Sequence, residues 1–280
     1  MVAETSSSQA KEINVTQKIH SSAIIEQGAV LGDDVTIGPF CYVGEHVHLG
    51  NGCHLHSHAS VVGYTDLADE VELFTHSVLG QAPQVIGYKP SAASKLIVGA
   101  RSVFREMVSV HTGFSEGKST TEIGTDCYMM ANTHLGHDVI MGNKVVIANG
   151  TQIGGHVEIG NNVWFGGLAA VHQFTRIGRN AFVGGGAIVV EDIIPFGSVI
   201  GNRAHLAGLN VVGLKRNGFS KADIRDIRAA YKLIFLESGQ FADRLLQAEQ
   251  DFVDQPLALE VLSFIRESGK RAICKPERAT

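Results

Sequence analysis

Apolar residues recur at every sixth position over most of the first 195 residues. Three unbroken series carry this pattern, and their first and last members are Ile19 and Leu79, Val98 and Val110, and Ile123 and Val189. A period of six matches neither the 3.6-residue period of a helix nor the two-residue period of a strand. The pattern predicts a short strand and a turn every six residues, with one apolar side chain pointing inward each time.

Three such strands would close a triangular coil of about 18 residues, and stacked coils would pair as parallel strands. We therefore predict a mainly β protein, with a parallel β-helix over residues 13–195 after a flexible tail at residues 1–12. The pattern is interrupted twice, and we expect loop insertions at residues 80–97 and 111–122. Loops that project from a regular solenoid usually carry function.

The six-residue pattern stops near Pro195, and we expect residues 196–280 to form a connecting segment and a C-terminal α-helical domain. Helical spacing of apolar residues begins after Ser220 and Asp223, which resemble an N-terminal capping pair. Two shorter helices are expected around residues 240–252 and 256–268. These helices would cover the open end of the β-helix.

The composition agrees with a tightly turning chain that buries a core. There are 32 glycines among 280 residues, which suits many turns, and apolar residues make up 44%. The net charge of −5 argues against general nucleic-acid binding, and no apolar run has the length of a membrane span. The four cysteines have no metal-binding spacing, which favours a reducing compartment.

Four histidines fall in one stripe when the sequence is wound into coils of this length. Residues 18 positions apart would lie above one another, so three neighbouring coils would carry the stripe on one side. Its members are His134, His137, His156 and His172. His111 joins the stripe if the two loops do not change the phase of the repeat.

The residues around this stripe supply the groups that acyl transfer requires. Asp138 follows His137 directly, and a carboxylate can fix the tautomer of a neighbouring imidazole. Gly154 and Gly155 precede His156, so backbone N–H groups are available nearby. A histidine base, a carboxylate and backbone donors are the parts of a base-assisted acyl transfer.

Three other interpretations of the stripe stay open. The histidines could be solvated turn residues, zinc ligands as in carbonic anhydrases of this general fold, or part of a subunit interface. A second, smaller column of His58 and His76 lies on another side by the same count. We interpret this second column as structural or interfacial.

Longer motifs in the same region resemble one enzyme family. The motifs are NTHLGHD at residues 132–138, GGH at 154–156, AVHQF at 170–174, GLKR at 213–216 and AYKLI at 230–234. Together they are similar to the UDP-N-acetylglucosamine O-acyltransferases, the first enzymes of lipid A biosynthesis. The resemblance runs from about Ile19 to the first C-terminal helix, and it implies that the β-helix is left-handed.

The resemblance implies a reaction and three catalytic residues. The family transfers a 3-hydroxyacyl chain from the phosphopantetheine arm of acyl carrier protein to the 3-hydroxyl of UDP-N-acetylglucosamine, with no metal and no other cofactor. His137 would be the general base and Asp138 would orient it. The backbone N–H of Gly155 would stabilise the oxyanion.

The resemblance also implies a set of substrate-binding residues. His134, His156, His172 and Gln173 would position the nucleotide sugar. Asn210 and Arg216 would contact the nucleotide or the donor, and Gly185 would set the acyl length and leave room for a long chain. Two further matches are Gln84 and Met130. The sequence departs from the family pattern at Val212, at Asn217 and in the loop that holds Lys89 and Lys95.

Partners follow from the same resemblance. The family is a homotrimer with sites between neighbouring subunits, and Trp164 and Phe165 are candidates for the contact, although Phe165 also belongs to the inward series. A basic patch within an acidic protein would attract acidic acyl carrier protein. The patch consists of Lys215, Arg216, Lys221, Arg225, Arg228 and Lys232.

Other functions stay open at this point. The chain could be another hexapeptide acyltransferase or acetyltransferase acting on a sugar or an amine, a zinc protein like carbonic anhydrase, or a non-catalytic scaffold. The N-acyltransferase of the same pathway has an additional uridine-binding domain, for which repeats that start by Ile19 leave no room. We expect a cytoplasmic protein in a bacterium, or one in the matrix of a mitochondrion or plastid in a plant.

Overall fold

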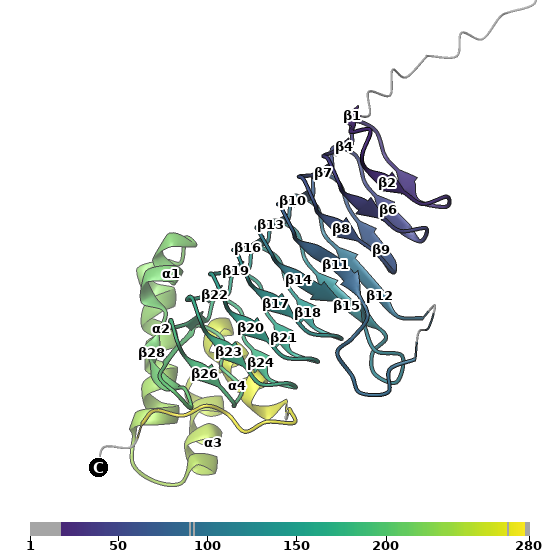
Figure 1. Ribbon diagram of the computed structural model, residues 1–280. Helices are drawn as coiled ribbons and strands as arrows, with labels where there is room; N and C mark the ends of the chain where they lie inside the picture. The colour runs from purple at the N-terminus through teal and green to yellow at the C-terminus, as the bar shows by residue number, and fades with distance from the viewer. Residues whose placement is uncertain (1–17, 90, 92, 268, 278–280) are drawn as a thin grey trace, which may run out of the picture.

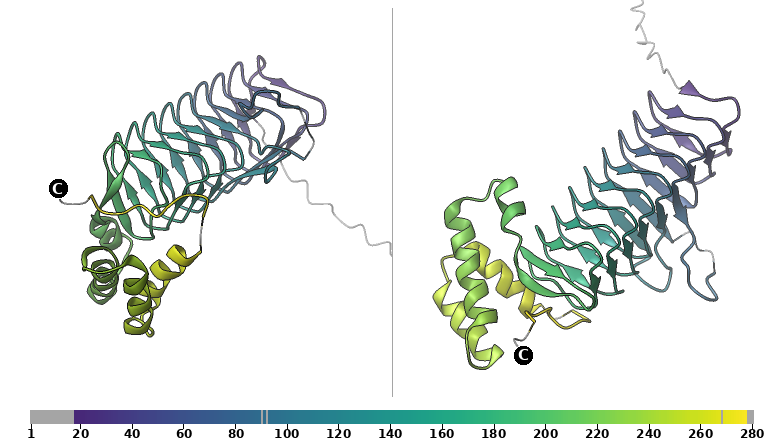
Figure 2. Two further views of the ribbon diagram at one scale, coloured as in Figure 1. Left: turned by 90° about the horizontal axis from the view of Figure 1, so that it is seen from below. Right: turned by 60° about the vertical axis from the view of Figure 1, so that its left-hand side comes forward.

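The computed structural model describes residues 18–89, 91, 93–267 and 269–277. These residues form a left-handed parallel β-helix, followed by a group of helices beside its last coils (Figures 1 and 2). The flexible tail predicted at residues 1–12 lies outside the described residues. Within them, the strands form three sheets, here named A, B and C, and each sheet takes every third strand up to β26, after which β27 and β28 both join sheet A.

Sheet A consists, in spatial order, of β1 (Lys18–Ile19), β4 (Thr36–Ile37), β7 (His54–Leu55), β10 (Glu72–Leu73), β13 (Val103–Phe104), β16 (Tyr128–Met129), β19 (Val146–Ile147), β22 (Trp164–Phe165), β25 (Phe182–Val183), β27 (Gly197–Ile200) and β28 (His205–Leu209). Sheet B consists of β2 (Ile24–Ile25), β5 (Tyr42–Val43), β8 (Ser60–Val61), β11 (Val78–Gln81), β14 (Ser109–His111), β17 (His134–Leu135), β20 (Gln152–Ile153), β23 (Ala170–Val171) and β26 (Ile188–Val189). Sheet C consists of β3 (Val30–Leu31), β6 (Val47–Leu49), β9 (Tyr64–Leu67), β12 (Lys95–Val98), β15 (Thr120–Ile123), β18 (Ile140–Met141), β21 (Glu158–Ile159) and β24 (Arg176–Ile177).

The pairing register follows the repeat, and after each of the two loops the chain enters the next sheet in the same order. Thr36 pairs with His54, 18 positions further on. Glu72 pairs with Val103, which is 31 positions further on, so 13 residues are inserted there. Val103 pairs with Tyr128 across 25 positions, an insertion of 7 residues. Both loops are shorter than predicted because β12 and β15 hold the last residues of each predicted insertion.

The apolar series points into the prism. Leu55, Ile147 and Phe165 are completely buried there, and burying such a side chain stabilises the fold by about 1.5–3 kcal/mol. The suggestion that Phe165 belongs to a subunit contact is therefore wrong, since its ring fills the interior. Its neighbour Trp164 points outward and is 43% exposed.

The corners of the prism use the left-handed backbone region, which residues other than glycine adopt only at a cost. Asp138, His156 and Phe174 all have φ near +60° at the corner between sheets B and C. The N–H of His156 donates to the carbonyl of His137 at 2.9 Å, and the N–H of Phe174 donates to that of Gly155 at 3.1 Å. These bonds keep successive corners in register, so their side chains form a column.

The C-terminal part differs from the prediction at its start. The predicted connecting segment contains β27, β28 and a short helix, α1 (Val211–Arg216), and the antiparallel β28 ends sheet A. The remaining helices are α2 (Lys221–Tyr231), the π-helix η1 (Lys232–Leu236), α3 (Phe241–Asp251) and α4 (Pro256–Arg266). The predicted capping box at the start of α2 is confirmed, because Ser220 and Asp223 exchange both hydrogen bonds.

Candidate active site

The corner between sheets B and C, here called the BC corner, carries the histidine stripe. His137 and Asp138 lie between β17 and β18, and His156 lies one coil further on, between β20 and β21. His137, Asp138 and His156 each present one donor atom within 4.8 Å of the others. The 18-residue register therefore brings together residues that the sequence alone placed in one stripe.

A buried carboxylate holds His137. The Nδ1 atom of His137 lies 2.6 Å from Oδ2 of Asp138, whose side chain is completely buried. The same Oδ2 accepts a hydrogen bond from the N–H of Phe114 at 3.1 Å. The N–H of Asp138 in turn donates to Oγ1 of Thr121 at 2.9 Å. An ionised carboxylate only accepts hydrogen bonds, so the His137 proton sits on Nδ1 and Nε2 keeps its lone pair.

The environment of Asp138 keeps it ionised. Burial raises the pKa of this carboxyl, but the hydrogen bonds from His137 and from Phe114, with the nearby His156, outweigh it, and the pKa lies below its ordinary value. The second oxygen, Oδ1, is buried and has no hydrogen-bond partner among the described residues. The proton at this pair therefore belongs to the imidazole, as a general base needs.

Gly155 lies against the reactive side of His137. A Cβ atom at this position would be only 2.8 Å from Nε2 of the imidazole, so a larger residue would displace the ring. Among the described residues, the N–H of Gly155 has no hydrogen-bond partner. A free N–H beside the base is the arrangement that an oxyanion site requires.

The loop between β14 and β15 closes over the carboxylate. Phe114 contributes its N–H to Asp138, and its ring meets the His137 ring edge-on at 5.8 Å. Gly117 approaches so closely that a Cβ there would be 2.7 Å from Oδ2 of Asp138. On the other side, the ring of Phe174 stacks on His156 at 4.5 Å. The sequence analysis assigned no role to Phe114 or Phe174, although the AVHQF motif includes Phe174.

Two further histidines lie deeper along the corner. His111 is buried and meets the ring of His134 edge-on at 4.6 Å, so it lies next to the histidine stripe. Burial, together with the neighbouring His134 and His137, lowers the pKa of His111 to about 4. Burial also lowers the pKa of His134, whose Nδ1 lies 2.8 Å from the hydroxyl of Ser109. Both imidazoles are therefore neutral near pH 7.

The end of the chain returns to the same corner. Ile273 bridges to Asp192, a buried carboxylate that accepts a hydrogen bond from Nε of Arg176 at 2.7 Å (Figure 1, in yellow). This anchor brings Arg271 to His172, where its Nη2 donates to Nδ1 at 2.6 Å. It also places Nζ of Lys270 3.9 Å from the centre of the Phe174 ring. Sequence reasoning missed both cations, because no local pattern links them to residues almost 100 positions earlier.

A cavity of about 790 Å³ opens beside the corner. Its walls include His156, Phe174 and Lys270, together with Phe114 and Lys118 of the loop. The mixture of aromatic rings and cations suits a ligand with both apolar and anionic parts.

Comparisons with known proteins indicate the family of this chain. Residues 192–274 match the family model described as "Udp N-acetylglucosamine O-acyltransferase; Domain 2", and residues 28–63 match the bacterial transferase hexapeptide model. The chain is 40% identical to the acyl-[acyl-carrier-protein]–UDP-N-acetylglucosamine O-acyltransferase of Bartonella henselae, over 93% of this chain and 94% of that protein. It is 44% identical to the enzyme of the same name from Azorhizobium caulinodans, over 93% and 96%.

The chain belongs to the UDP-N-acetylglucosamine O-acyltransferase family. A solved structure of LpxA from Acinetobacter baumannii has a TM-score of 0.87 to this chain, at 35% identity over 92% of this chain and 99% of that one. In the described part of the chain, no helix has the length and apolar character of a membrane span.

Four of the other residues expected from the acyltransferase family lie away from the BC corner. Met130 and Gly185 follow β16 and β25, at the corner between sheets A and B. Asn210 caps α1 and donates to the carbonyl of Asn180 at the third corner. Arg216 lines a second cavity, of about 770 Å³, with Trp164 of sheet A.

Several residues that correspond to family positions are exposed on the surface. Gln84 and Lys89 lie exposed in the loop between β11 and β12, and Lys95 is exposed at the first position of β12. Gln173 lies exposed on the BC corner beside His172. At the departures from the family pattern, Val212 lines the second cavity, and Asn217 donates to Oδ1 of Asn180 at 2.7 Å. One chain therefore brings together the residues expected to be catalytic but spreads the residues expected to bind substrate over three corners.

Proposed function

We propose that this protein transfers a 3-hydroxyacyl chain from acyl carrier protein to the 3-hydroxyl of UDP-N-acetylglucosamine, the first step of lipid A biosynthesis. One observation carries the proposal. Asp138 holds Nδ1 of His137, which leaves Nε2 free beside the N–H of Gly155. Family membership supplies the identity of the two substrates.

The chemistry follows from this arrangement. Nε2 of His137 takes the proton of the sugar 3-hydroxyl as that oxygen attacks the thioester carbon. The N–H of Gly155 stabilises the negative charge that develops on the carbonyl oxygen. When the tetrahedral intermediate collapses, the carbon–sulfur bond breaks and the imidazolium returns its proton to the leaving thiolate. An ester and a free phosphopantetheine thiol result, so His137 ends in its starting state.

Asp138 supports both halves of the reaction. Its carboxylate fixes the imidazole tautomer before the attack and stabilises the imidazolium that forms afterwards. The neutral His134 and His156, together with His172 and Gln173, position the nucleotide sugar along the same corner. Lys270 and Arg271 add positive charge where the diphosphate or the phosphopantetheine phosphate approaches.

The protein acts as a homotrimer in this proposal. Asn210 and Arg216 line a cavity on sheet A, and Met130 and Gly185 lie on another corner, although all four are expected to bind substrate. A threefold assembly would bring these surfaces of one subunit against the BC corner of the next. The exposed Trp164 is then part of the contact.

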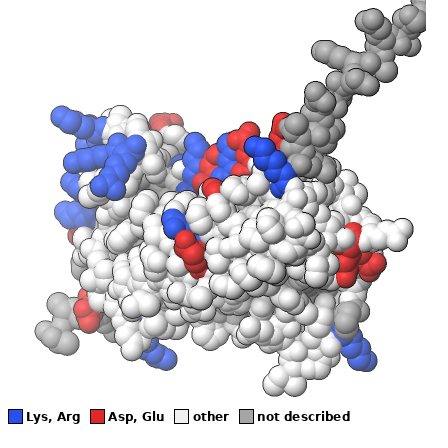
Figure 3. All heavy atoms as spheres, turned by 45° about the horizontal axis from the view of Figure 1, so that its top comes forward, with Lys and Arg blue, Asp and Glu red and all other residues white. Residues whose placement is uncertain are grey.

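Acyl carrier protein docks on the basic patch at α1 and α2. Figure 3 shows Lys and Arg side chains gathered at the end of the molecule that carries these helices. All six members of the patch are exposed in the structure. An acidic carrier would be attracted to this surface and deliver its acyl chain there. We expect the reaction to take place in the bacterial cytoplasm or in a plant organelle.

The test is a transfer assay with 3-hydroxyacyl carrier proteins of several chain lengths and UDP-N-acetylglucosamine. We expect activity with at least one chain length and a large loss in His137→Ala. Binding of UDP-N-acetylglucosamine without transfer from any carrier would show that the donor is wrong, and acetyl-CoA would be the next donor to test.

A further inference from the structure

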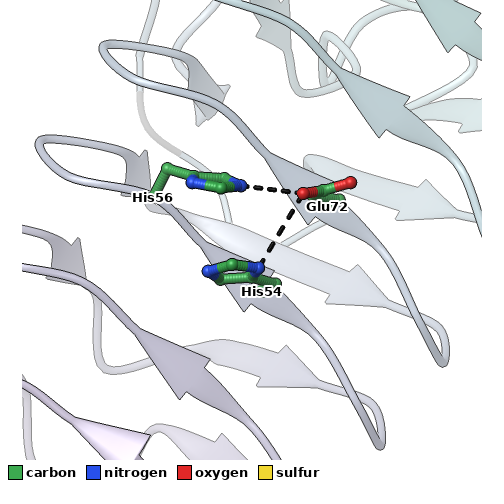
Figure 4. A group of neighbouring side chains, drawn as sticks. All are labelled: His54, His56 and Glu72. Atoms are coloured by element: carbon green, nitrogen blue, oxygen red, sulfur yellow. Dashed lines mark hydrogen bonds and ion pairs between the residues drawn. The ribbon is translucent and has the colours of Figure 1, made fainter.

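A second cluster of two imidazoles and one carboxylate lies on sheet A (Figure 4). His54 belongs to β7, His56 follows that strand directly, and Glu72 belongs to β10 on the next coil. Oε1 of Glu72 lies 2.7 Å from Nε2 of His56 and 3.8 Å from Nδ1 of His54. The three donor atoms all lie within 4.8 Å of one another.

Aromatic stacking holds both rings in this position. The His54 and His56 rings stack with their centres 4.0 Å apart. The ring of Phe74 stacks on His56 at 4.4 Å, and Arg105 lies over the same Phe74 ring. As a result, one nitrogen of each imidazole faces the same carboxylate oxygen (Figure 4).

An ordinary hydrogen bond accounts for only half of this arrangement. His56 and Glu72 form one, but His54 makes no side-chain hydrogen bond to any other described residue. Nδ1 of His54 faces the same carboxylate oxygen from beyond hydrogen-bond distance, so it is placed as a ligand would be.

We propose that His54, His56 and Glu72 bind one divalent transition-metal ion of the Zn²⁺ class. Tetrahedral zinc with bonds of 2.0–2.1 Å needs donor atoms about 3.3 Å apart, a value between the two measured distances to Glu72. Two imidazoles and a carboxylate suit zinc, cobalt or nickel, whereas Mg²⁺ and Ca²⁺ prefer oxygen donors alone. Solvent completes the coordination, since each of the three side chains is about one-third exposed or more.

This site is separate from the acyl-transfer centre. It lies on sheet A, whereas His137 lies on the BC corner. A bound ion would link β7 to β10 and so join two successive coils near the N-terminal end of the prism. Its role would be structural, since it would stabilise the folded chain by binding the native state only.

The experiment is a calorimetric titration of the full-length, chelator-treated protein with Zn²⁺. We expect the native protein to bind one equivalent of Zn²⁺ per chain. His54→Ala and Glu72→Gln should bind Zn²⁺ at least tenfold more weakly. We also expect Zn²⁺ to raise the Tm of the native protein but not that of either variant, and Mg²⁺ to have no effect. His58→Ala and His76→Ala are matched controls, because these two rings stack on the same coils outside the cluster.

Two results would overturn the proposal. The first is the absence of Zn²⁺ binding to the native protein. The second is an equivalent that persists in His54→Ala and Glu72→Gln but disappears in His137→Ala, which would place the ion on the BC corner. Acyl transfer by both cluster variants should equal that of the native protein, which shows that they fold and separates this proposal from the catalytic one.

Discussion

The two histidine–carboxylate clusters of this molecule have almost the same composition but different surroundings. At the BC corner, Asp138 is completely buried and accepts a hydrogen bond from a backbone N–H, and the rings of His137 and His156 meet edge-on. On sheet A, the Glu72 side chain is 35% exposed and, among the described residues, accepts no backbone hydrogen bond. The two imidazoles beside it lie stacked.

The difference shows what converts a carboxylate into a partner for a general base. Burial and backbone hydrogen bonds leave Asp138 one orientation, so it can select one tautomer of His137. Glu72 keeps access to solvent and faces two imidazoles at once, which suits a cation better than a proton transfer. Residue types alone would not distinguish the two clusters.

The strongest test of this comparison removes the base. We expect His137→Ala to lower kcat/KM for acyl transfer by about 1,000-fold, within the range for loss of a general base. His54→Ala should leave the transfer rate unchanged. A comparable loss in both variants would show that the two clusters do not have separate roles.

The next effect concerns the buried part of the BC corner. The pKa of His111 is lowered from 6.5 in the unfolded chain to about 4 in the folded chain. Between these two pH values, the unfolded chain binds a proton at this residue and the folded chain does not. Stability should therefore be constant above pH 6.5 and fall by about 3 kcal/mol towards pH 4 on account of this residue. Urea unfolding between pH 7.5 and 4.5 measures the effect, and His111→Gln should reduce the slope. An unchanged slope in the variant would assign the pH dependence to other groups.

Removing the two carboxylate charges tests the comparison directly. Asp138→Asn should lower kcat by about 100-fold, because an amide no longer selects the tautomer with the lone pair on Nε2. Glu72→Gln, the matched change on sheet A, should not alter kcat. Equal kcat values for the two variants in the transfer assay would contradict the assignment of Asp138 as the orienting residue.

The close approach of Gly155 to the base can be tested by adding a single methyl group. A Cβ would lie 2.8 Å from Nε2 of His137, so Gly155→Ala should displace the ring and lower kcat by up to about 100-fold. Gly44→Ala is a suitable control, since its Cβ would meet only ordinary contacts, the nearest at 3.5 Å. Equal rates for the two variants would show that the contact has no catalytic consequence.

The smallest expected effect concerns the returning C-terminal segment. Arg271→Ala removes the hydrogen bond to His172 and should raise KM for UDP-N-acetylglucosamine about fivefold, with little change in kcat. Arg271→Lys should restore part of the affinity. A change in kcat alone would indicate that the segment acts on the reacting groups instead of on binding.

The histidine column could be predicted from the sequence because the fold is a repeat. The 18-residue register turned a distance along the chain into a position in space, and so His134, His137 and His156 could be assigned to one stripe. The ring of His111 could be added only with the structure, since two loops of 13 and 7 inserted residues lie before or beside it. The inward series also predicted the core. Phe165 was assigned both to this series and to the subunit contact, and it fills only the interior.

The sequence by itself determined the β-helix, the capped helix after it and the column of histidines, because each depends on a local period or a local hydrogen bond. The tertiary structure decided the rest. Pairing of Ile273 with Asp192 joins positions 81 residues apart and brings Arg271 to His172, and no repeat specifies that contact. The burial of Asp138 and the exposure of Glu72 likewise depend on which segments cover each cluster, so only the packed chain distinguishes the proposed base from the proposed cation site.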